Sequence, residues 1–159
     1  MRIAFLACAL TLPDSPERRP DAFEHDQMID CLTPALAAHG ALIDAIRWDA
    51  EDIDWSAYDA VLIGSAWDYQ DKLEAFLARL DLIESQTRLF NPGQIVRWNC
   101  RKTYLNDLAA KGLATVSTLW LDTPDANALS GAFDALGSDD LVLKRQVGAN
   151  AEGQFRLHR

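Results

Sequence analysis

The run Ile-Ala-Phe-Leu-Ala-Cys at residues 3–8 decides the interpretation of the first half of the chain. Such a continuous apolar run is typical of a strand covered on both faces in a parallel sheet. Further strands are predicted at Ala41–Trp48, Tyr58–Ser65 and Arg88–Phe90. Helices are predicted at Ala22–His39 and along the apolar stripe Leu73, Phe76, Leu77, Leu80 and Ile83. This order of elements predicts a Rossmann-like α/β fold with a mainly parallel sheet.

Beyond Trp98 the pattern changes to that of a small α+β, lid-like unit. Its expected elements are a helix at Arg101–Lys111, a strand at Thr118–Leu121, a helix at Pro124–Leu136 and strands at Leu141–Lys144 and Gln154–His158. Asn99 is expected to cap the first helix, and Gly112 to end it. We therefore predict two domains, 1–98 and 99–159, joined without a flexible linker.

Composition narrows the classes of partner. The 159 residues carry a formal net charge of −9 and contain no basic stripe, which argues against nucleic acid and anionic membranes as partners. No apolar run approaches the roughly 20 residues of a membrane span. Cys8, Cys31 and Cys100 are odd in number and lack CxxC spacing, so we expect reduced thiols in a cytoplasmic protein. The scattered histidines form no zinc pattern, and no metal site is predicted in this chain.

Two lysines and a loop are the candidates for anion binding. Lys102 is expected in the first turn of its helix, where the helix dipole would favour a bound phosphate. Lys144 ends a strand and would lie on the same face as Val142. The small residues of the loop Gly148–Gly153 allow backbone amides to approach phosphates closely. Each feature has a plainer interpretation: a solvated lysine, a strand-end lysine in water, and a hairpin loop.

The order of these features resembles the ATP-grasp superfamily, and the glutathione-synthetase-like and D-cycloserine-ligase-like bacterial members in particular. The resemblance covers most of the chain. It rests on Trp67-Asp68-Tyr69, Phe76-Leu77, Asn91-Pro92, Arg97-Trp98-Asn99, Lys102-Thr103-Tyr104-Leu105, Gly112, Thr118 and Leu141-Val142-Leu143-Lys144. The chain departs from the family pattern at Arg145, where proline is common, and in its imperfect copy of the glycine-rich loop.

The resemblance implies roles for particular residues. Lys102 would contact the phosphates of ATP, and Lys144 the α-phosphate and the adenine edge. The loop residues Gly148, Ala149, Asn150 and Gly153 would close over the β- and γ-phosphates. Magnesium is expected as a second cofactor, with its ligands in a later part of the family fold.

A small-molecule substrate would bind at the carboxyl ends of the first domain's strands, as in open α/β sheets generally. The candidate residues are Ser65, Trp67, Asp68, Tyr69 and Asn91, together with the loop after Cys8. For Trp67 and Tyr69, packing at the domain interface is the alternative role.

The implied function is the N-terminal part of an ATP-dependent carboxylate–amine ligase that acts through an acyl-phosphate. The family has a further subdomain beyond the position of Arg159, so we expect these 159 residues to be inactive alone. Two alternatives remain: a non-catalytic binding or interaction module with this fold, and an unrelated Rossmann-like domain that uses no ATP. Apolar surface left uncovered in an incomplete lid also predicts a homodimer through residues 100–159.

Overall fold

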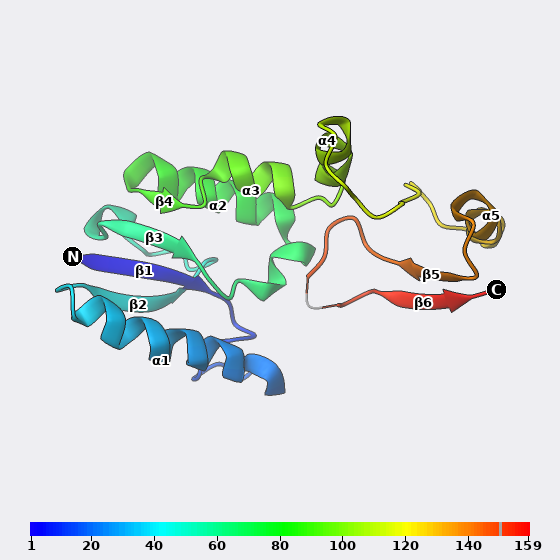
Figure 1. Ribbon diagram of the computed structural model, residues 1–159. Helices are drawn as coiled ribbons and strands as arrows, with labels where there is room; N and C mark the ends of the chain where they lie inside the picture. The colour runs from blue at the N-terminus through cyan, green and yellow to red at the C-terminus, as the bar shows by residue number, and fades with distance from the viewer. Residues whose placement is uncertain (150) are drawn as a thin grey trace. The chain divides into compact units, whose positions relative to one another are not determined.

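The structure is a computed structural model that describes residues 1–149 and 151–159. The chain divides into two compact units, Met1–Trp98 and Asn99–Arg159, which we call the sheet unit and the lid unit. Figure 1 shows the elements of both.

A four-stranded parallel sheet forms the centre of the sheet unit. Its strands lie in the order β2-β1-β3-β4, and every pairing between them is parallel. Their bounds are Arg2–Ala7 for β1, Leu42–Arg47 for β2, Ala60–Ile63 for β3 and Leu89–Phe90 for β4. The apolar run at residues 3–8 thus supplies the strand that is flanked on both sides, as its composition predicts. The expected α/β fold with a parallel sheet is confirmed.

Helices cover both faces of this sheet. Successive side chains of a strand point to opposite faces. Leu6 of β1 joins the apolar core with Phe76 and Leu80 of α2 (Leu73–Gln86). The neighbouring Phe5 contacts His25 of α1 (Phe23–Ala37) edge to face, with ring centroids 5.7 Å apart. The two helices therefore pack against opposite faces.

The connection from β2 to β3 buries one large side chain, that of Trp55. It contains only the 3-10 turn η2 (Trp55–Ala57), begun by Asp54, whose carboxylate accepts a hydrogen bond from the Ser56 amide. Trp55 is completely buried in the core with Trp48 and Phe76. Its indole nitrogen has no hydrogen-bond partner within the part of the chain that the structure describes. The buried indole ring thus packs this connection into the core without a crossover helix.

Within its described residues, the lid unit contains two helices and a two-stranded antiparallel sheet. The helix α3 (Gly93–Asn99) ends at the first residue of the lid unit. The elements that follow are α4 (Tyr104–Ala110), α5 (Ala126–Leu136), β5 (Asp140–Leu143) and β6 (Phe155–His158). The Asp125 carboxylate caps α5 by accepting a hydrogen bond from the Ala128 amide at 2.7 Å, and Gly137 ends the helix at φ +61°. That positive φ is the left-handed conformation that glycine adopts without strain.

Three expectations for the lid unit are wrong. Asn99 is the last residue of α3 and caps nothing, and the helix expected at Arg101–Lys111 begins only at Tyr104. The Lys102 amide donates to the Gln146 carbonyl at 2.8 Å, which holds this residue in a turn before the helix. The strand expected at Thr118–Leu121 does not form, because β5 and β6 pair only with each other among the described residues.

Within residues 1–149 and 151–159, no helix combines the length and the apolar character that crossing a membrane requires.

Candidate functional site

A buried polar cluster lies at the carboxyl ends of β1 and β3. The Ser65 hydroxyl lies 2.7 Å from His25 Nδ1 and 3.2 Å from the Thr11 hydroxyl. Thr11 Oγ1 also lies 3.1 Å from the Cys8 carbonyl and accepts a hydrogen bond from the Cys8 amide. Thr11 and Ser65 are fully buried and His25 is 2% exposed. We call these four residues the switch cluster, because β1 and β3 flank the point where the strand order reverses.

Local sequence explains how the cluster is assembled. The ring of Phe5 lies so close to Gly64 that a methyl group there would be 2.0 Å from Phe5 Cζ. Only glycine permits that approach, and it brings the turn after β3 against β1. His25 comes from the first turn of α1, which returns the chain to the same edge of the sheet. Burial lowers the pKa of His25, opposed by the nearby Asp26 carboxylate and reinforced by the Arg18 guanidinium.

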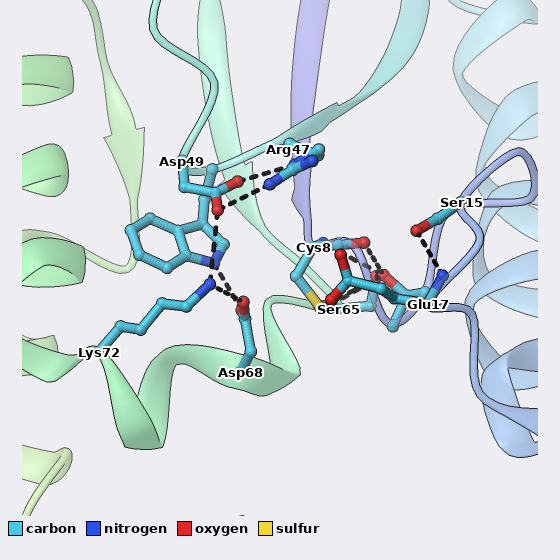
Figure 2. Close-up of polar contacts among 10 residues, drawn as sticks. Cys8, Ser15, Glu17, Arg47, Asp49, Ser65, Asp68 and Lys72 are labelled. Atoms are coloured by element: carbon cyan, nitrogen blue, oxygen red, sulfur yellow. Dashed lines mark hydrogen bonds and ion pairs between the residues drawn. The ribbon is translucent and has the colours of Figure 1, made fainter.

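A charged network lies beside the switch cluster (Figure 2). The indole of Trp48 donates to Asp68 Oδ1 at 2.7 Å, and Lys72 Nζ donates to Asp68 Oδ2 at 3.0 Å. Lys72 also lies 3.6 Å from Asp49, which pairs with Arg47 through two hydrogen bonds of 2.9 Å. The Arg47 hydrogen bonds lower the pKa of Asp49, and the Asp68 hydrogen bond raises the pKa of Lys72. Charges of alternating sign therefore stabilise one another along this edge.

The predicted substrate residues differ in how accessible they are. Ser65 is fully buried, and both oxygens of Asp68 are already bound. Tyr69 packs on Phe76 with ring centroids 5.4 Å apart. Trp67 is half-buried against the core, with the Arg19 guanidinium 5.8 Å from its ring centroid. Asn91 is exposed and has a φ of +60°.

Surface hollows adjoin the loop that follows Cys8. One has a volume of about 490 Å³ and is lined by Pro13, His25, Asp26, Ile29, Asp30 and Ala45. A second, of about 460 Å³, is lined by Leu12–Pro16, Ala45 and Arg47. The loop expected to face a substrate thus lines both hollows, and the buried His25 lines the first. The sequence interpretation missed His25 and Trp48, and it included Thr11 only as part of the loop after Cys8. Trp48 directly follows β2, whereas His25 gave no signal in the sequence.

The lid unit brings Lys102 to the small-residue loop. Lys102 Nζ donates to the Gly148 carbonyl at 2.7 Å, across 46 residues of sequence. Burial lowers the pKa of Lys102, and the positive charges of Lys144 and Arg145 lower it further. Lys144 itself is exposed and comes directly after β5. The two predicted lysines and the start of the loop therefore belong to one cationic region.

The loop between β5 and β6 has an unusual backbone. Ala151 and Gly153 have φ of +57° and +65°, and the Glu152 amide donates to the Ala149 carbonyl at 3.0 Å. A methyl group on Gly153 would lie 2.7 Å from Arg145 Cδ, so the arginine stem lies against the loop. Asn150, predicted as a loop contact, lies outside the described residues. Among the residues that are described, no three His, Cys, Asp or Glu side chains are grouped to hold a metal ion.

Comparison with known proteins shows the family to which this chain belongs. The model of the N-terminal domain of D-cycloserine synthetase DcsG matches residues 3–91, more than half of the chain. The chain belongs to this family. Cycloserine biosynthesis protein DcsG of Streptomyces lavendulae is 33% identical over 132 residues, which is 80% of this chain and 44% of that protein. The predicted resemblance to D-cycloserine-ligase-like bacterial proteins is thereby confirmed.

Solved structures agree with the membership in the DcsG N-terminal domain family. The crystal structure of D-cycloserine synthetase DcsG has a TM-score of 0.82 and 27% identity, covering 99% of this chain and 50% of that one. An ATP-grasp RimK domain protein from Sphaerobacter thermophilus DSM 20745 has a TM-score of 0.65 and 19% identity, covering 100% and 54%. The second likeness concerns the fold alone. The chain spans about half the length of these relatives.

Proposed function

We propose that this chain forms the N-terminal part of an ATP-dependent carboxylate–amine ligase. In this proposal the sheet unit binds the carboxylate substrate, and the lid unit is the first part of the ATP-binding lid. The observation that carries it is the hydrogen bond from Lys102 Nζ to the Gly148 carbonyl, which joins the predicted phosphate lysine to the predicted phosphate loop. Membership in the DcsG N-terminal domain family supports the ligase class.

The cations of the lid unit fit the triphosphate of ATP. Lys102 is half-buried and lies near two further positive charges, Lys144 and Arg145. Repulsion among them favours a multiply charged anion, whose phosphates would replace the Gly148 carbonyl as partner of Lys102. Phosphoryl transfer requires chiefly positioning and charge neutralisation from the protein, and lysines with backbone amides supply both.

The chemistry follows from the ligand classes. A carboxylate oxygen would attack the γ-phosphorus, ADP would leave, and an amine would then displace phosphate from the acyl-phosphate. Magnesium would be held by carboxylate and amide oxygens of the later ATP-grasp subdomain. Cys8 and Cys100 are buried, and no disulfide joins the cysteines of the described residues, which suits the reducing cytoplasm that we propose as the location.

We place the small-molecule carboxylate at the carboxyl ends of the strands in the sheet unit. Trp67 and Asn91 are the predicted contacts that remain accessible, and the hollows beside the loop after Cys8 adjoin this edge. Ser65, Asp68 and Tyr69 would then act indirectly, by holding this edge in shape through their contacts with His25, Trp48 and Phe76.

Nucleotide binding tests the proposal. Lys102→Ala and Lys144→Ala should each weaken ATP binding about tenfold or more, because each removes a charge-assisted hydrogen bond to phosphate. Lys111→Ala is the matched control, because it removes the same charge from an exposed residue that directly follows α4. Calorimetric titration in the longest chain containing these residues measures the effect. Equal affinity in all three variants would reject the ATP role and favour a Rossmann-like domain that uses no ATP.

The 159 residues alone should not catalyse ligation, since they span about half of the relatives' length. With ATP, magnesium and candidate acids and amines, ADP release should stay at background. Turnover above background contradicts this part of the proposal. ATP binding without turnover in the whole protein favours the non-catalytic binding module.

We also propose self-association through residues 100–159. This region exposes several large apolar side chains, namely Leu113, Val116, Leu119, Val142 and Phe155. Exposed apolar surface of this kind tends to be covered by a partner. Light scattering at high concentration should therefore report a dimer of the 159-residue chain, and a monomer would refute it.

A further inference from the structure

We propose that Arg145 is a third polyphosphate-binding cation of the lid unit, held at the loop by its contact with Gly153. This inference rests on the proposed function, since it adds a charge to the site of Lys102 and Lys144. The ligand class is the triphosphate group of a nucleotide or inorganic tripolyphosphate, which share the same chain of charged oxygens.

Geometry positions Arg145 at the loop. It follows β5 by two residues, after Lys144. A Cβ added to Gly153 would lie 2.7 Å from Arg145 Cδ and 3.0 Å from its Cγ. The stem of the arginine therefore passes over the backbone of residue 153, in space that only glycine leaves open. Gly153 also has a φ of +65°, which side-chain-bearing residues rarely adopt.

Electrostatic repulsion between their positive charges links Arg145 to Lys102. The pKa of Lys102 is lowered by burial first, by Lys144 second and by Arg145 third, so all three cations act on one region. Like charges held near one another repel, and an anion with several charges relieves that repulsion. A guanidinium additionally offers two parallel donors to a phosphate, which an ammonium group cannot do. Arg145 therefore supplies a contact that a lysine would replace only in part.

Titration calorimetry of the 159-residue chain with inorganic tripolyphosphate tests this inference. Arg145→Ala should weaken binding roughly tenfold, and Arg145→Lys by less. Arg156→Ala is the control: it removes the same charge from β6, where the Arg156 side chain is 78% exposed and paired with Asp140. The control should change affinity less than about twofold. Gly153→Ala should weaken binding in the same direction as Arg145→Ala, because the added methyl displaces the arginine stem.

A second measurement needs no ligand. The pKa of Lys102, followed by NMR at its Cε, should rise in Arg145→Ala and stay unchanged in Arg156→Ala. The inference is overturned if Arg145→Ala and Arg156→Ala have the same affinity for tripolyphosphate and the same pKa of Lys102. If Lys102→Ala and Lys144→Ala weaken binding while Arg145→Ala does not, the inference fails and the proposed function stands. If the unmodified chain does not bind tripolyphosphate, the inference fails, and the proposed function is decided separately by ATP binding in the longest chain.

Discussion

Ser65 connects the two loops that follow β1 and β3, because its hydroxyl lies between His25 and Thr11. Ser65→Ala should lower the free energy of unfolding by about 1–3 kcal/mol, since it leaves a fully buried imidazole nitrogen without its partner. Urea denaturation followed by circular dichroism measures this. The control is Ser85→Ala, an exposed serine whose hydroxyl donates to the Leu82 carbonyl. An equally small effect in both variants would mean that the switch cluster contributes little.

His25 should make stability depend on pH. Burial lowers its pKa below the usual 6.5, so the unfolded chain binds a proton more readily than the folded one. The contribution of neutral His25 is therefore complete above pH 6.5 and is lost as pH falls below that value. Replacing His25 with Gln should flatten the decline in unfolding free energy below pH 6.5, measured by denaturation at several pH values. His39→Gln, at an exposed position, should retain the decline; identical profiles would contradict the prediction.

For single residues, the sequence predicts where a side chain lies better than it predicts what that side chain does. Ser65 and Asp68 could be picked out because parallel strands bring their carboxyl ends to one edge. The partner of Asp68, the indole of Trp48, lies 20 residues away, and no local pattern connects the two. His25 gave no signal, because a single histidine near a helix start is usually exposed. Its ring contacts Phe5, which in turn lies against Gly64.

Among the elements, the 3-10 turn η3 (Trp67–Asp71) depends on Asp68, which joins it to Trp48 and to Lys72. Asp68→Ala should destabilise the fold by about 1–3 kcal/mol, because the buried indole N–H loses its acceptor. Asp68→Asn should cost less, since its amide oxygen can still accept that bond. The exposed Asp52→Ala controls for the lost charge. Thermal unfolding followed by circular dichroism ranks the variants; a larger loss in Asn than in Ala would reject this explanation.

Elements with a strong apolar pattern were predictable, and those without one were not. The strands of the sheet unit lie within one or two residues of their expected bounds. For the central strands β1 and β3 the reason is a continuous apolar run that packs into the core. Between residues 99 and 121 the propensities are weak. There the Lys102 amide bonds to Gln146 from outside the helix, and residues 118–121 find no strand to pair with among those described. Such outcomes depend on distant segments.

Across the whole molecule, burial is distributed unevenly between the units. Of the buried apolar residues, only Cys100 and Ala132 belong to the lid unit as described. We therefore expect amide hydrogens of β1 and β3 to exchange slowest, and those of residues 114–120 fastest. These latter residues have no helical or strand pairing in the described structure. Native-state hydrogen exchange by mass spectrometry measures the difference, and uniform protection across both units would contradict it.

The distribution of indole rings has a spectroscopic consequence. Trp48 and Trp55 are buried in the core of the sheet unit, whereas Trp120 is the single tryptophan of the lid unit. Indole emission shifts to longer wavelength when the ring enters water, so the intrinsic fluorescence spectrum will follow the opening of the sheet unit. Loosening of the lid unit will leave that spectrum nearly unchanged. One dye-free optical signal can therefore distinguish the two events in the same sample.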